Sequence, residues 1–449
     1  MHRFDDTAAE TFELVVQFVR ERLAVADVPL DHHSSPADLA ERAPSLIGRG
    51  PRSVAEVWDQ YTSVLAPSVL STDSPRFLSF IPAAPTKLAC LFDMVVSASS
   101  LNGTSWLEGA GAIHVENQVL RVIADAAGLP ASAGGCFVSG GSAANLSALV
   151  VARDVARHRR GDRTRLRIAA SRETHSSVAN TARMLDCDLL LVDTVNGRMS
   201  GAGLDAALAL DPEPSTVVAV VATAGTTNAG IIDDLAGIGE VARDRGLWFH
   251  VDGAYGGAAL FAPSVRRRFD GIELADSLVV DPHKWLFAPF DCAALVYRSP
   301  MLAKGVHTQN AAYLDSIHDH DDEWNPTDFA YHLTRRARGL ATWFSMAVHG
   351  LDAYSEAIER SLATARSVAD RIRTMPHLEL MAQPDLSVVM FRRRGWDLDR
   401  YHAWSDQLLA DGIGLVLPSR WQGDPLLRFA ILHPETTLEI IDEILDTLA

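Results

Sequence analysis

Seven short apolar runs alternate with helical stretches through the middle of the 449-residue chain. The runs are rich in Val, Ile, Leu and Ala, which is typical of strands that are buried on both faces of a sheet. Strands that alternate with helices form a mostly parallel sheet. The expected strands cover residues 135–139, 166–170, 189–193, 216–222, 247–252, 277–280 and 293–297. We therefore predict an α/β fold with a large, doubly wound, seven-stranded domain.

The N-terminal segment predicts two helices, because apolar residues recur at helical spacing over 8–25 and 53–66. Two such helices cannot close a core of their own, so we expect them to pack against a second copy of the chain.

The segment after the sheet begins with a His- and Asp-rich stretch, 300–333, which predicts an irregular loop. Helical spacing then runs from 334 to 373, and later apolar runs with a last helix at 436–448 predict a small α+β domain. The expected division is an N-terminal helical arm over 1–82, a large domain over 83–340 and a small C-terminal domain over 341–449.

Charge and composition exclude several classes of partner. A formal net charge of −17 argues against nucleic acid, because nucleic-acid-binding surfaces are basic. No apolar run reaches the roughly 18 residues of a membrane span, and the first residues lack a secretory signal. The four cysteines are widely spaced, without a CxxC pair, and we expect reduced thiols and no metal site. These features predict a cytoplasmic protein with no membrane partner.

Lys284 stands just beyond the carboxyl end of the strand at 277–280, after Pro282 breaks that strand. Ligands of open α/β sheets bind at this edge. Apolar neighbours favour a neutral amine, which can form a Schiff base with an aldehyde. The alternative is an exposed surface lysine, as most lysines are.

Other polar groups end neighbouring strands. Gly140-Gly-Ser142 opens a helix, where backbone N–H groups can hold an anion, although a simple tight turn has the same sequence. Asp252 ends a buried strand and needs a cation or a donor there, unless it caps a helix. His175 stands between a strand and a helix, where it could cover a flat ring or be structural. Thr223 lies in a polar turn that ends a further strand.

Each group has an ordinary explanation alone, but together they have one economical explanation. An anion cradle, a buried acid, a histidine that can stack and a lysine at one sheet edge predict pyridoxal phosphate, held as a Schiff base with an acid at its ring nitrogen.

The sequence resembles the group II pyridoxal-phosphate-dependent amino-acid decarboxylases, the family of aromatic-L-amino-acid decarboxylase, over nearly its whole length. The matching motifs are Asp281-Pro-His-Lys-Trp285, Phe290-Asp-Cys292, His250-Val-Asp-Gly-Ala-Tyr255, Thr174-His-Ser-Ser177, Gly140-Gly-Ser-Ala-Ala-Asn145 and Arg335-Arg336. The resemblance implies a type I, aspartate-aminotransferase-like fold and a homodimer with active sites at the interface.

The resemblance also implies roles for single residues. Lys284 would form the Schiff base, Asp252 would pair with the ring nitrogen, and Ala254 and His175 would cover the two ring faces. The phosphate would be held by Gly141, Ser142, Ser277 and His283, with Thr223 close to Asp252. The substrate pocket would be lined by Phe77, Phe80, Pro82, Trp106, Phe290 and Phe329. The family's reaction passes through a quinonoid intermediate and gives CO₂ and an amine, and the expected substrate is an L-amino acid, with an aromatic one favoured.

One position departs from the family. A tyrosine that follows Asp in a mobile loop is taken to protonate the carbanion there, but matching on Asp328 puts Phe329 at its place. Phenylalanine has no proton to give. Relatives with Phe there let O₂ react and form an aldehyde, so an oxidative deaminase (aldehyde synthase) is the alternative. We favour simple decarboxylation, because Tyr331 lies two residues further on. Other donors in the loop are His307, His318 and His320.

Two further alternatives remain open. Type I folds also host aminotransferases, and Arg428 stands where such an enzyme could bind a carboxylate, although the resemblance favours a structural role. An inactive cofactor-binding dimer is the non-enzyme alternative, but Lys284, Asp252 and His175 are all present. Asp281 replaces an Asn of many aromatic-acid relatives, and the sequence offers no explanation for that change.

Overall fold

The computed structural model describes residues 2–81, 84–317 and 323–449. Its largest feature is a seven-stranded sheet with the strand order β1-β7-β6-β5-β4-β2-β3, in which β7 runs antiparallel to its neighbours. The strands are β1 (Gly134–Val138), β2 (Arg167–Ser171), β3 (Asp188–Val192), β4 (Val217–Thr223), β5 (Trp248–Asp252), β6 (Ser277–Val280) and β7 (Ala293–Tyr297). The predicted mostly parallel α/β sheet is confirmed.

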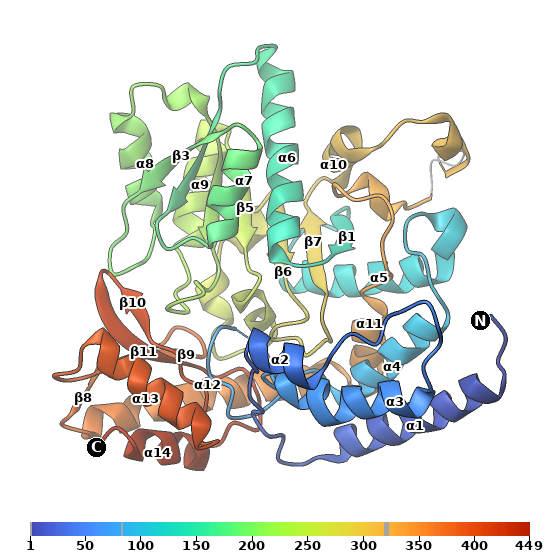
Figure 1. Cartoon of the computed structure of the whole chain (residues 1–449). Coiled ribbons are helices and arrows are strands. Elements are labelled where there is room, and N and C mark those ends of the chain that lie inside the picture. The colour runs from blue at the N-terminus through green and yellow to red at the C-terminus, as the bar shows by residue number, and fades with distance from the viewer. Residues whose placement is uncertain (1, 82–83, 318–322) are drawn as a thin grey trace.

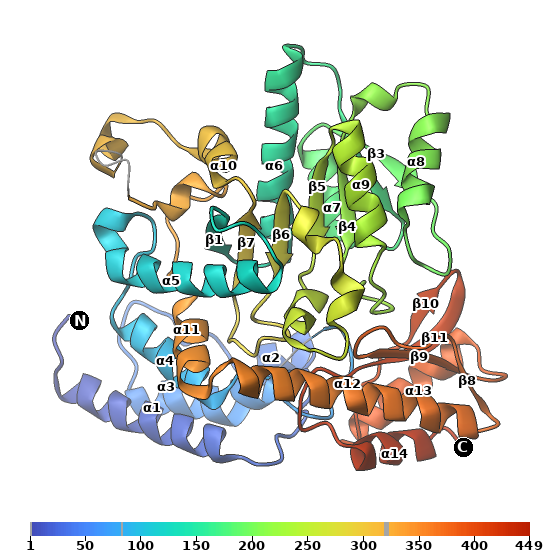
Figure 2. The ribbon, with the colours of Figure 1, turned by 180° about the vertical axis from the view of Figure 1, so that it is seen from behind.

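Helices cover both faces of this sheet. Figure 1 shows α6 (Gly141–Arg160) and α7 (Ser176–Met184) in front of it, and Figure 2 shows α5 (Trp106–Ala126) and α9 (Leu235–Arg245) from behind. α8 (Gly201–Leu210), which the sequence analysis does not predict, packs against α9. The sheet is therefore the middle layer of three.

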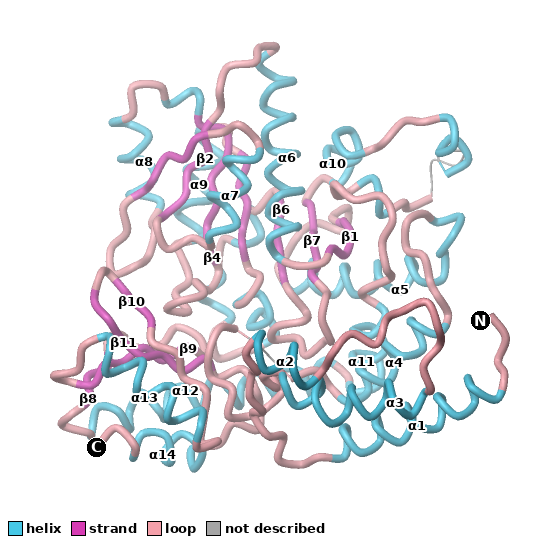
Figure 3. Tube along the Cα trace, viewed as in Figure 1, coloured by secondary structure: helices cyan, strands magenta, loops and turns pink. Residues whose placement is uncertain are grey.

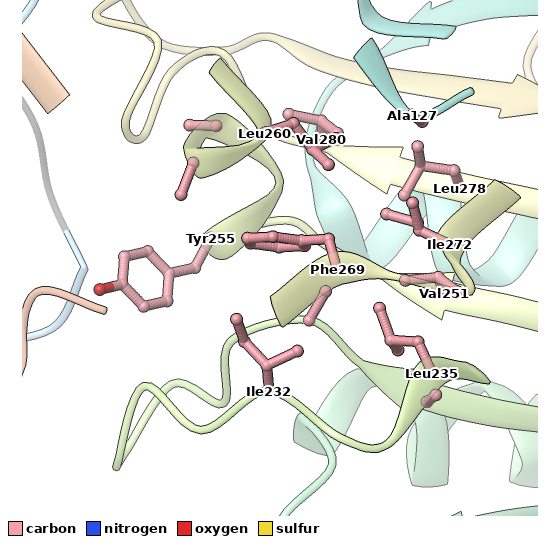
Figure 4. Packing of buried hydrophobic residues seen from close by; sticks show 14 of the residues in the cluster. Ala127, Ile232, Leu235, Val251, Tyr255, Leu260, Phe269, Ile272, Leu278 and Val280 are labelled. Carbon is pink, nitrogen blue, oxygen red and sulfur yellow. The ribbon is translucent and has the colours of Figure 1, made fainter. Parts of the chain in front are cut away.

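The main core lies between the sheet and the elements behind it. Val251 of β5 and Leu278 of β6 lie beside Ile272 from the loop that joins these two strands, and Val280 and Phe269 belong to the same buried cluster (Figure 4). All five are almost fully inaccessible to solvent. Burying an aliphatic or aromatic side chain of this size contributes about 1.5–3 kcal/mol. This core holds the carboxyl ends of β5 and β6 rigidly in place.

A second, antiparallel sheet forms the C-terminal part (Figure 3), with the order β10-β11-β9-β8. Its strands are β8 (Leu378–Leu380), β9 (Val388–Arg393), β10 (Ser419–Trp421) and β11 (Asp424–Ala430), with helices α13 (Leu398–Ala410) and α14 (Leu438–Asp446). The predicted small α+β unit is thus present. The division after residues 82 and 340 stays a prediction, and residues 82–83 lie outside the described part.

Two expectations for the region after the large sheet are wrong. The stretch 300–333 contains a helix, α10 (Pro300–His307), which begins with a proline at a favourable first position. The helix expected over 334–373 is two helices, α11 (Leu340–His349) and α12 (Leu351–Thr374). Gly350, with a positive φ of 78°, separates α11 from α12.

The N-terminal helices α1 (Asp6–Ala24), α2 (Pro36–Arg42) and α3 (Val54–Gln60) lie in the lower part of Figure 1, as does α4 (Lys87–Ala98). α1 contacts α3 through Phe18, whose ring centroid is 5.8 Å from that of Trp58. Across the described residues, no helix has the length and apolar character needed to cross a membrane.

Candidate functional site

A cavity of about 840 Å³ opens at the carboxyl ends of β1, β2, β4, β5 and β6. The candidate residues of several loops meet there, as the parallel arrangement of the strands requires. Its polar lining residues include Ser142, Asn145, His175, Ser177, Asn180, Thr223, Asp252, Asp281, His283, Lys284, Asp291 and Tyr331.

Lys284 enters the cavity from the turn that follows β6. Its Nζ lies 2.9 Å from Oδ2 of Asp281, and the lysine side chain is 24% exposed. The next residue, Trp285, is completely buried, and its ring stacks on that of Tyr255 with centroids 5.4 Å apart. This stacked tryptophan anchors the backbone beside Lys284 at the cavity.

The amino end of α6 forms one wall of the cavity. The backbone N–H of Gly141 donates to Oδ2 of Asp281 over 3.2 Å. A Cβ atom at Gly141 would lie 3.0 Å from Cβ of Ala254 and 3.1 Å from the Asp281 carboxylate, so a side chain there would press on both neighbours. The start of a 20-residue helix favours negative charge, and Ser142 adds an exposed hydroxyl. This wall can hold a phosphate.

Asp252 ends β5 and is buried, with both carboxylate oxygens bonded to neutral donors. Oδ1 accepts the backbone N–H of Ala254 over 3.1 Å, and Oδ2 accepts Nδ2 of Asn145 over 2.8 Å. Within the described part of the chain Asp252 forms no ion pair, and Oγ1 of the neighbouring Thr223 is buried with no partner. A carboxylate without a counter-cation, beside an unbonded hydroxyl, fits a ligand ring that carries an N–H⁺ group.

His175 caps the start of α7 and lines the cavity. Its Nδ1 accepts the backbone N–H of Ser177 over 3.2 Å and lies 2.9 Å from the Ser177 hydroxyl. The proton of the neutral ring therefore resides on Nε2.

His283 lies beside Lys284, and its Nδ1 accepts the backbone N–H of Cys292 over 3.0 Å. Burial lowers the pKa of His283, so the neutral ring is favoured, with its proton on Nε2. Nε2 lies 3.6 Å from Asp281. The ring of Phe290, which is exposed at the cavity mouth, lies 5.0 Å from the His283 ring. The two rings form one flank of the mouth.

The two aromatic residues of the loop before Arg335 have different positions. Tyr331 is half exposed and lines the cavity. Phe329 is buried in the core beneath, where its ring stacks on Trp324. Phe329 does not line the cavity, contrary to our expectation of a pocket residue.

Ser277 is also placed differently from the prediction. It is the first residue of β6, at the end of the strand that is remote from the cavity, and is completely buried. Its hydroxyl accepts the indole N–H of Trp248 and contacts His250, so it is not available to a phosphate.

Three predicted pocket aromatics lie outside this cavity. Phe77 is buried against Leu415, Phe80 is exposed, and Trp106 begins α5, with its backbone N–H bonded to Asn325. A contribution from these residues to the cavity of a second copy stays a prediction. Pro82 lies outside the described residues.

Sequence reasoning assigned no role to Asn145 or Asp281, although both line the cavity. Two signals were present. Asn145 follows Gly141 by one helical turn and so lies on the same helix face. Only three of the 40 basic residues are lysines, namely Lys87, Lys284 and Lys304. The rarity of lysine draws attention to Lys284 and to Asp281, which precedes it by three residues.

Comparisons with known proteins agree with this arrangement. Residues 36–394 match the family described as pyridoxal-dependent decarboxylase conserved domain. The aromatic-L-amino-acid decarboxylase of Bacillus atrophaeus is 30% identical over 384 residues, covering 83% of this chain and 80% of that protein. The L-2,4-diaminobutyrate decarboxylase of Rhizobium meliloti (strain 1021) is 32% identical over 387 residues, covering 82% and 75%. The crystal structure of Oryza sativa TDC with PLP and tryptamine superposes with a TM-score of 0.90 at 24% identity, covering 100% of this chain and 99% of that one, and shows the same fold.

Proposed function

The chain belongs to the pyridoxal-dependent decarboxylases, and from that premise we propose that it converts an aromatic L-amino acid into its amine and CO₂, with Tyr331 as the proton donor. The observation that carries the proposal is the meeting of Lys284, Asp252, His175 and Tyr331 in one cavity. Pyridoxal phosphate, when bound, supplies an aldehyde for amines and a ring that accepts the electrons released with CO₂.

Residues on three sides would hold the cofactor. Lys284 would form its bond to the aldehyde, and Asp252, which has no cationic partner among the described residues, would bind the ring N–H. The amino end of α6, at Gly141 and Ser142, would hold the phosphate. Ala254 and His175 line the cavity and would cover the ring. The cavity residues thus fit the aldehyde, the ring nitrogen and the phosphate of the cofactor.

His175 would orient the substrate. Its Nδ1 is occupied by Ser177, which leaves Nε2–H as the free donor of the ring. Such a donor would bind the substrate carboxylate and fix its direction in the cavity for the loss of CO₂.

Tyr331 would give the proton to the substrate carbon after CO₂ has left. Its phenol is the acidic O–H group on the loop that lines the cavity, and it is half exposed. The aldehyde-forming alternative, which uses O₂, was based on Phe329 in the tyrosine's place. The burial of Phe329 against Trp324, with Tyr331 at the cavity, supports amine formation over this alternative.

An aromatic substrate is supported by the cavity mouth. Phe290 and Tyr331 present rings there, and Leu146 and Met184 add apolar surface. Aromatic rings bind such surfaces through apolar area and edge contacts. Asp291, a carboxylate that could attract a cationic side chain, is paired with Arg338 over 2.8 Å. The names of the Bacillus and Rhizobium relatives give an aromatic and a diaminobutyrate substrate, respectively, so both belong in the test.

We also propose a homodimer. α1 has no buried residue in the single chain, and Phe12 on it is exposed, as are Leu91, Met94 and Val95 on α4. Exposed apolar side chains that gather on a surface mark a site of association.

The direct test incubates purified protein and pyridoxal phosphate with L-tryptophan, L-tyrosine, L-phenylalanine or L-2,4-diaminobutyrate, and measures CO₂ and amine. The proposal predicts CO₂ and an equal amount of amine, with a higher kcat/KM for the aromatic substrates. A preference for diaminobutyrate would overturn the substrate class, and a keto acid without CO₂ would indicate transamination.

A further inference from the structure

A line of hydrogen-bonded, buried side chains runs from Trp248, the first residue of β5, to the carboxylate of Asp252 at the cavity. The indole Nε1 of Trp248 donates to Oγ of Ser277 over 2.8 Å, and that oxygen lies 2.7 Å from Nδ1 of His250. Nε2 of His250 lies 2.9 Å from Oδ1 of Asn145, whose Nδ2 donates to Asp252 over 2.8 Å. All five residues are buried, and the proposed reaction uses only the last.

The two ends of this line, an indole N–H that can only donate and a carboxylate that can only accept, set the direction of its bonds. An indole N–H can only donate, so the Ser277 oxygen accepts and its hydrogen is free to donate to Nδ1 of His250. The proton of the neutral His250 ring is then on Nε2 and points at the Asn145 carbonyl. The Asn145 amide group in turn faces Asp252 with its hydrogens.

The opposite orientation of Asn145 is disfavoured. It would set Oδ1 against the Asp252 carboxylate at 2.8 Å, an acceptor against an acceptor. It would also make His250 donate to Ser277, which would leave the buried serine hydrogen without an acceptor. Burial lowers the pKa of His250 to about 4, so the ring is neutral at pH 7 and the line is intact there.

A branch of the same line reaches the other side of the cavity. Nδ2 of Asn145 also donates to Oγ of Ser177 over 2.9 Å, and the Ser177 hydroxyl can then donate to Nδ1 of His175 over 2.9 Å. The two amide hydrogens of Asn145 therefore bind Asp252 directly and His175 through the Ser177 hydroxyl.

We propose that Trp248, Ser277, His250 and Asn145 are positioning residues that act through Asp252 and His175. They keep the Asp252 carboxylate an acceptor that is turned toward the ring nitrogen of the cofactor, and they keep the His175 proton on Nε2, facing the substrate. This inference rests on the proposed function of the cavity, because it assigns the line a role in binding pyridoxal phosphate.

The first test needs no cofactor. In the apoprotein with ¹⁵N-labelled histidine, nitrogen shifts distinguish a protonated from a bare ring nitrogen, and His250→Gln and His175→Gln identify the two signals. The proposal predicts Nε2–H for both rings in the wild type. In Ser277→Ala the Nε2–H form of His250 should persist, because Asn145 still presents its carbonyl oxygen to Nε2. An Nδ1–H form of His250 in the wild type would overturn the proposal.

The second test measures the dissociation constant of pyridoxal phosphate and the absorption spectrum of the bound cofactor as a function of pH. Asn145→Asp keeps the size of the side chain but removes the donor to Asp252, and should weaken binding about tenfold or more, as expected for a bond to a charged group. Ser277→Ala should weaken it about twofold to tenfold. Both variants should shift the pH at which the spectrum changes.

Ser361→Ala is the matched control, because Ser361 is equally buried and donates to the Leu432 carbonyl in the C-terminal part. It should leave affinity and spectrum unchanged. Equal values in Ser277→Ala, Asn145→Asp and this control would overturn the proposal. A wild type that binds no pyridoxal phosphate would contradict the proposed function, whereas the apoprotein tautomers test the line of bonds in either case.

Discussion

The ring of Phe329 stacks on that of Trp324, with centroids 4.2 Å apart and an angle of 19° between the planes. The hydroxyl of Tyr297 donates to the Phe329 carbonyl over 3.1 Å, so side chain and backbone are both held in the core. Tyr331, two residues later, lines the cavity instead. In our account Tyr331 is therefore the residue that determines whether the product is an amine or an aldehyde.

Replacing the phenol of Tyr331 should slow amine formation more than it slows CO₂ release. Tyr331→Phe removes a proton donor, and general acids contribute about 10²- to 10⁴-fold to rate. We expect a loss in this range in amine formation, with aldehyde and peroxide appearing in air. Separate rates for CO₂ and for amine check the prediction.

The matched control is Phe329→Tyr, which restores the family's tyrosine in sequence but adds a hydroxyl inside the core. A buried hydroxyl without a partner costs about 1–3 kcal/mol, so the free energy of unfolding should fall while the product ratio stays the same. A rise in amine yield in this variant would show that Phe329 reaches the reaction after all.

Lys284 should be the residue that binds the cofactor covalently. Borohydride reduction of the holoenzyme fixes a Schiff base as a stable amine, and mass spectrometry of the digested protein locates it. Only two other lysines, Lys87 and Lys304, compete in this chain. The adduct should be found on the peptide that contains Lys284 and be absent in Lys284→Ala. Lys304, which lies 3.7 Å from Asp328, provides the control variant Lys304→Ala, in which the adduct should persist.

The amino end of α6 should tolerate no side chain at Gly141. A Cβ atom there would press on Ala254 and Asp281, so Gly141→Ala should raise the dissociation constant of pyridoxal phosphate at least about tenfold, a loss of roughly 1.4 kcal/mol. Gly111→Ala in α5 is a control, because a Cβ atom there meets nothing within 4 Å. It should leave affinity unchanged and, if anything, stabilise the helix by up to about 1 kcal/mol. Equal affinities in the two variants would contradict a phosphate site at this helix end.

Acid should destabilise the protein through His332. Burial and the nearby cations Arg335 and Arg338 lower the pKa of His332 to about 4. An unfolded histidine titrates near 6.5, so between pH 6.5 and 4 the unfolded chain binds a proton that the folded chain does not. Folding stability contributed by this group is present above pH 6.5 and is lost as the pH falls to 4, by up to about 3 kcal/mol.

Urea unfolding of the wild type and His332→Gln at pH 7 and pH 4.5 measures this contribution. The variant should lose less stability on acidification than the wild type, and His2→Gln, at an exposed position, should behave like the wild type. The comparison between variants is needed because burial also raises the pKa of Asp233 to about 7. Asp233 therefore stabilises the folded state more at low pH, which opposes the effect of His332 in the wild type. Parallel curves for wild type and His332→Gln would contradict the prediction.

The sheet is predictable from the sequence because its pattern is local. All seven strands fall within one residue of their predicted ends, since buried strands in a parallel sheet are continuous apolar runs bounded by turns. α8 is missed because Gly201 and Gly203 conceal its start and its ten residues form little more than two turns.

The site is only partly predictable, because distance along the chain does not determine which side chains meet. Lys284 and Asp252 follow from their positions at strand ends. Ser277 could have been excluded as a phosphate ligand, because it begins the same strand that Lys284 follows and so belongs to the opposite edge. The sequence could not reveal that Tyr331 lines the cavity while Phe329 is buried, because this depends on how a loop of irregular backbone packs on Trp324.

The most direct test of the central claim is to follow the products of an aromatic L-amino acid with the holoenzyme, in air and without oxygen. Our account predicts CO₂ and amine in equal amounts under both conditions, because Tyr331 supplies the proton. Aldehyde and peroxide formed only in air would contradict it, and would mean that the reaction is directed to oxygen despite a tyrosine at the cavity.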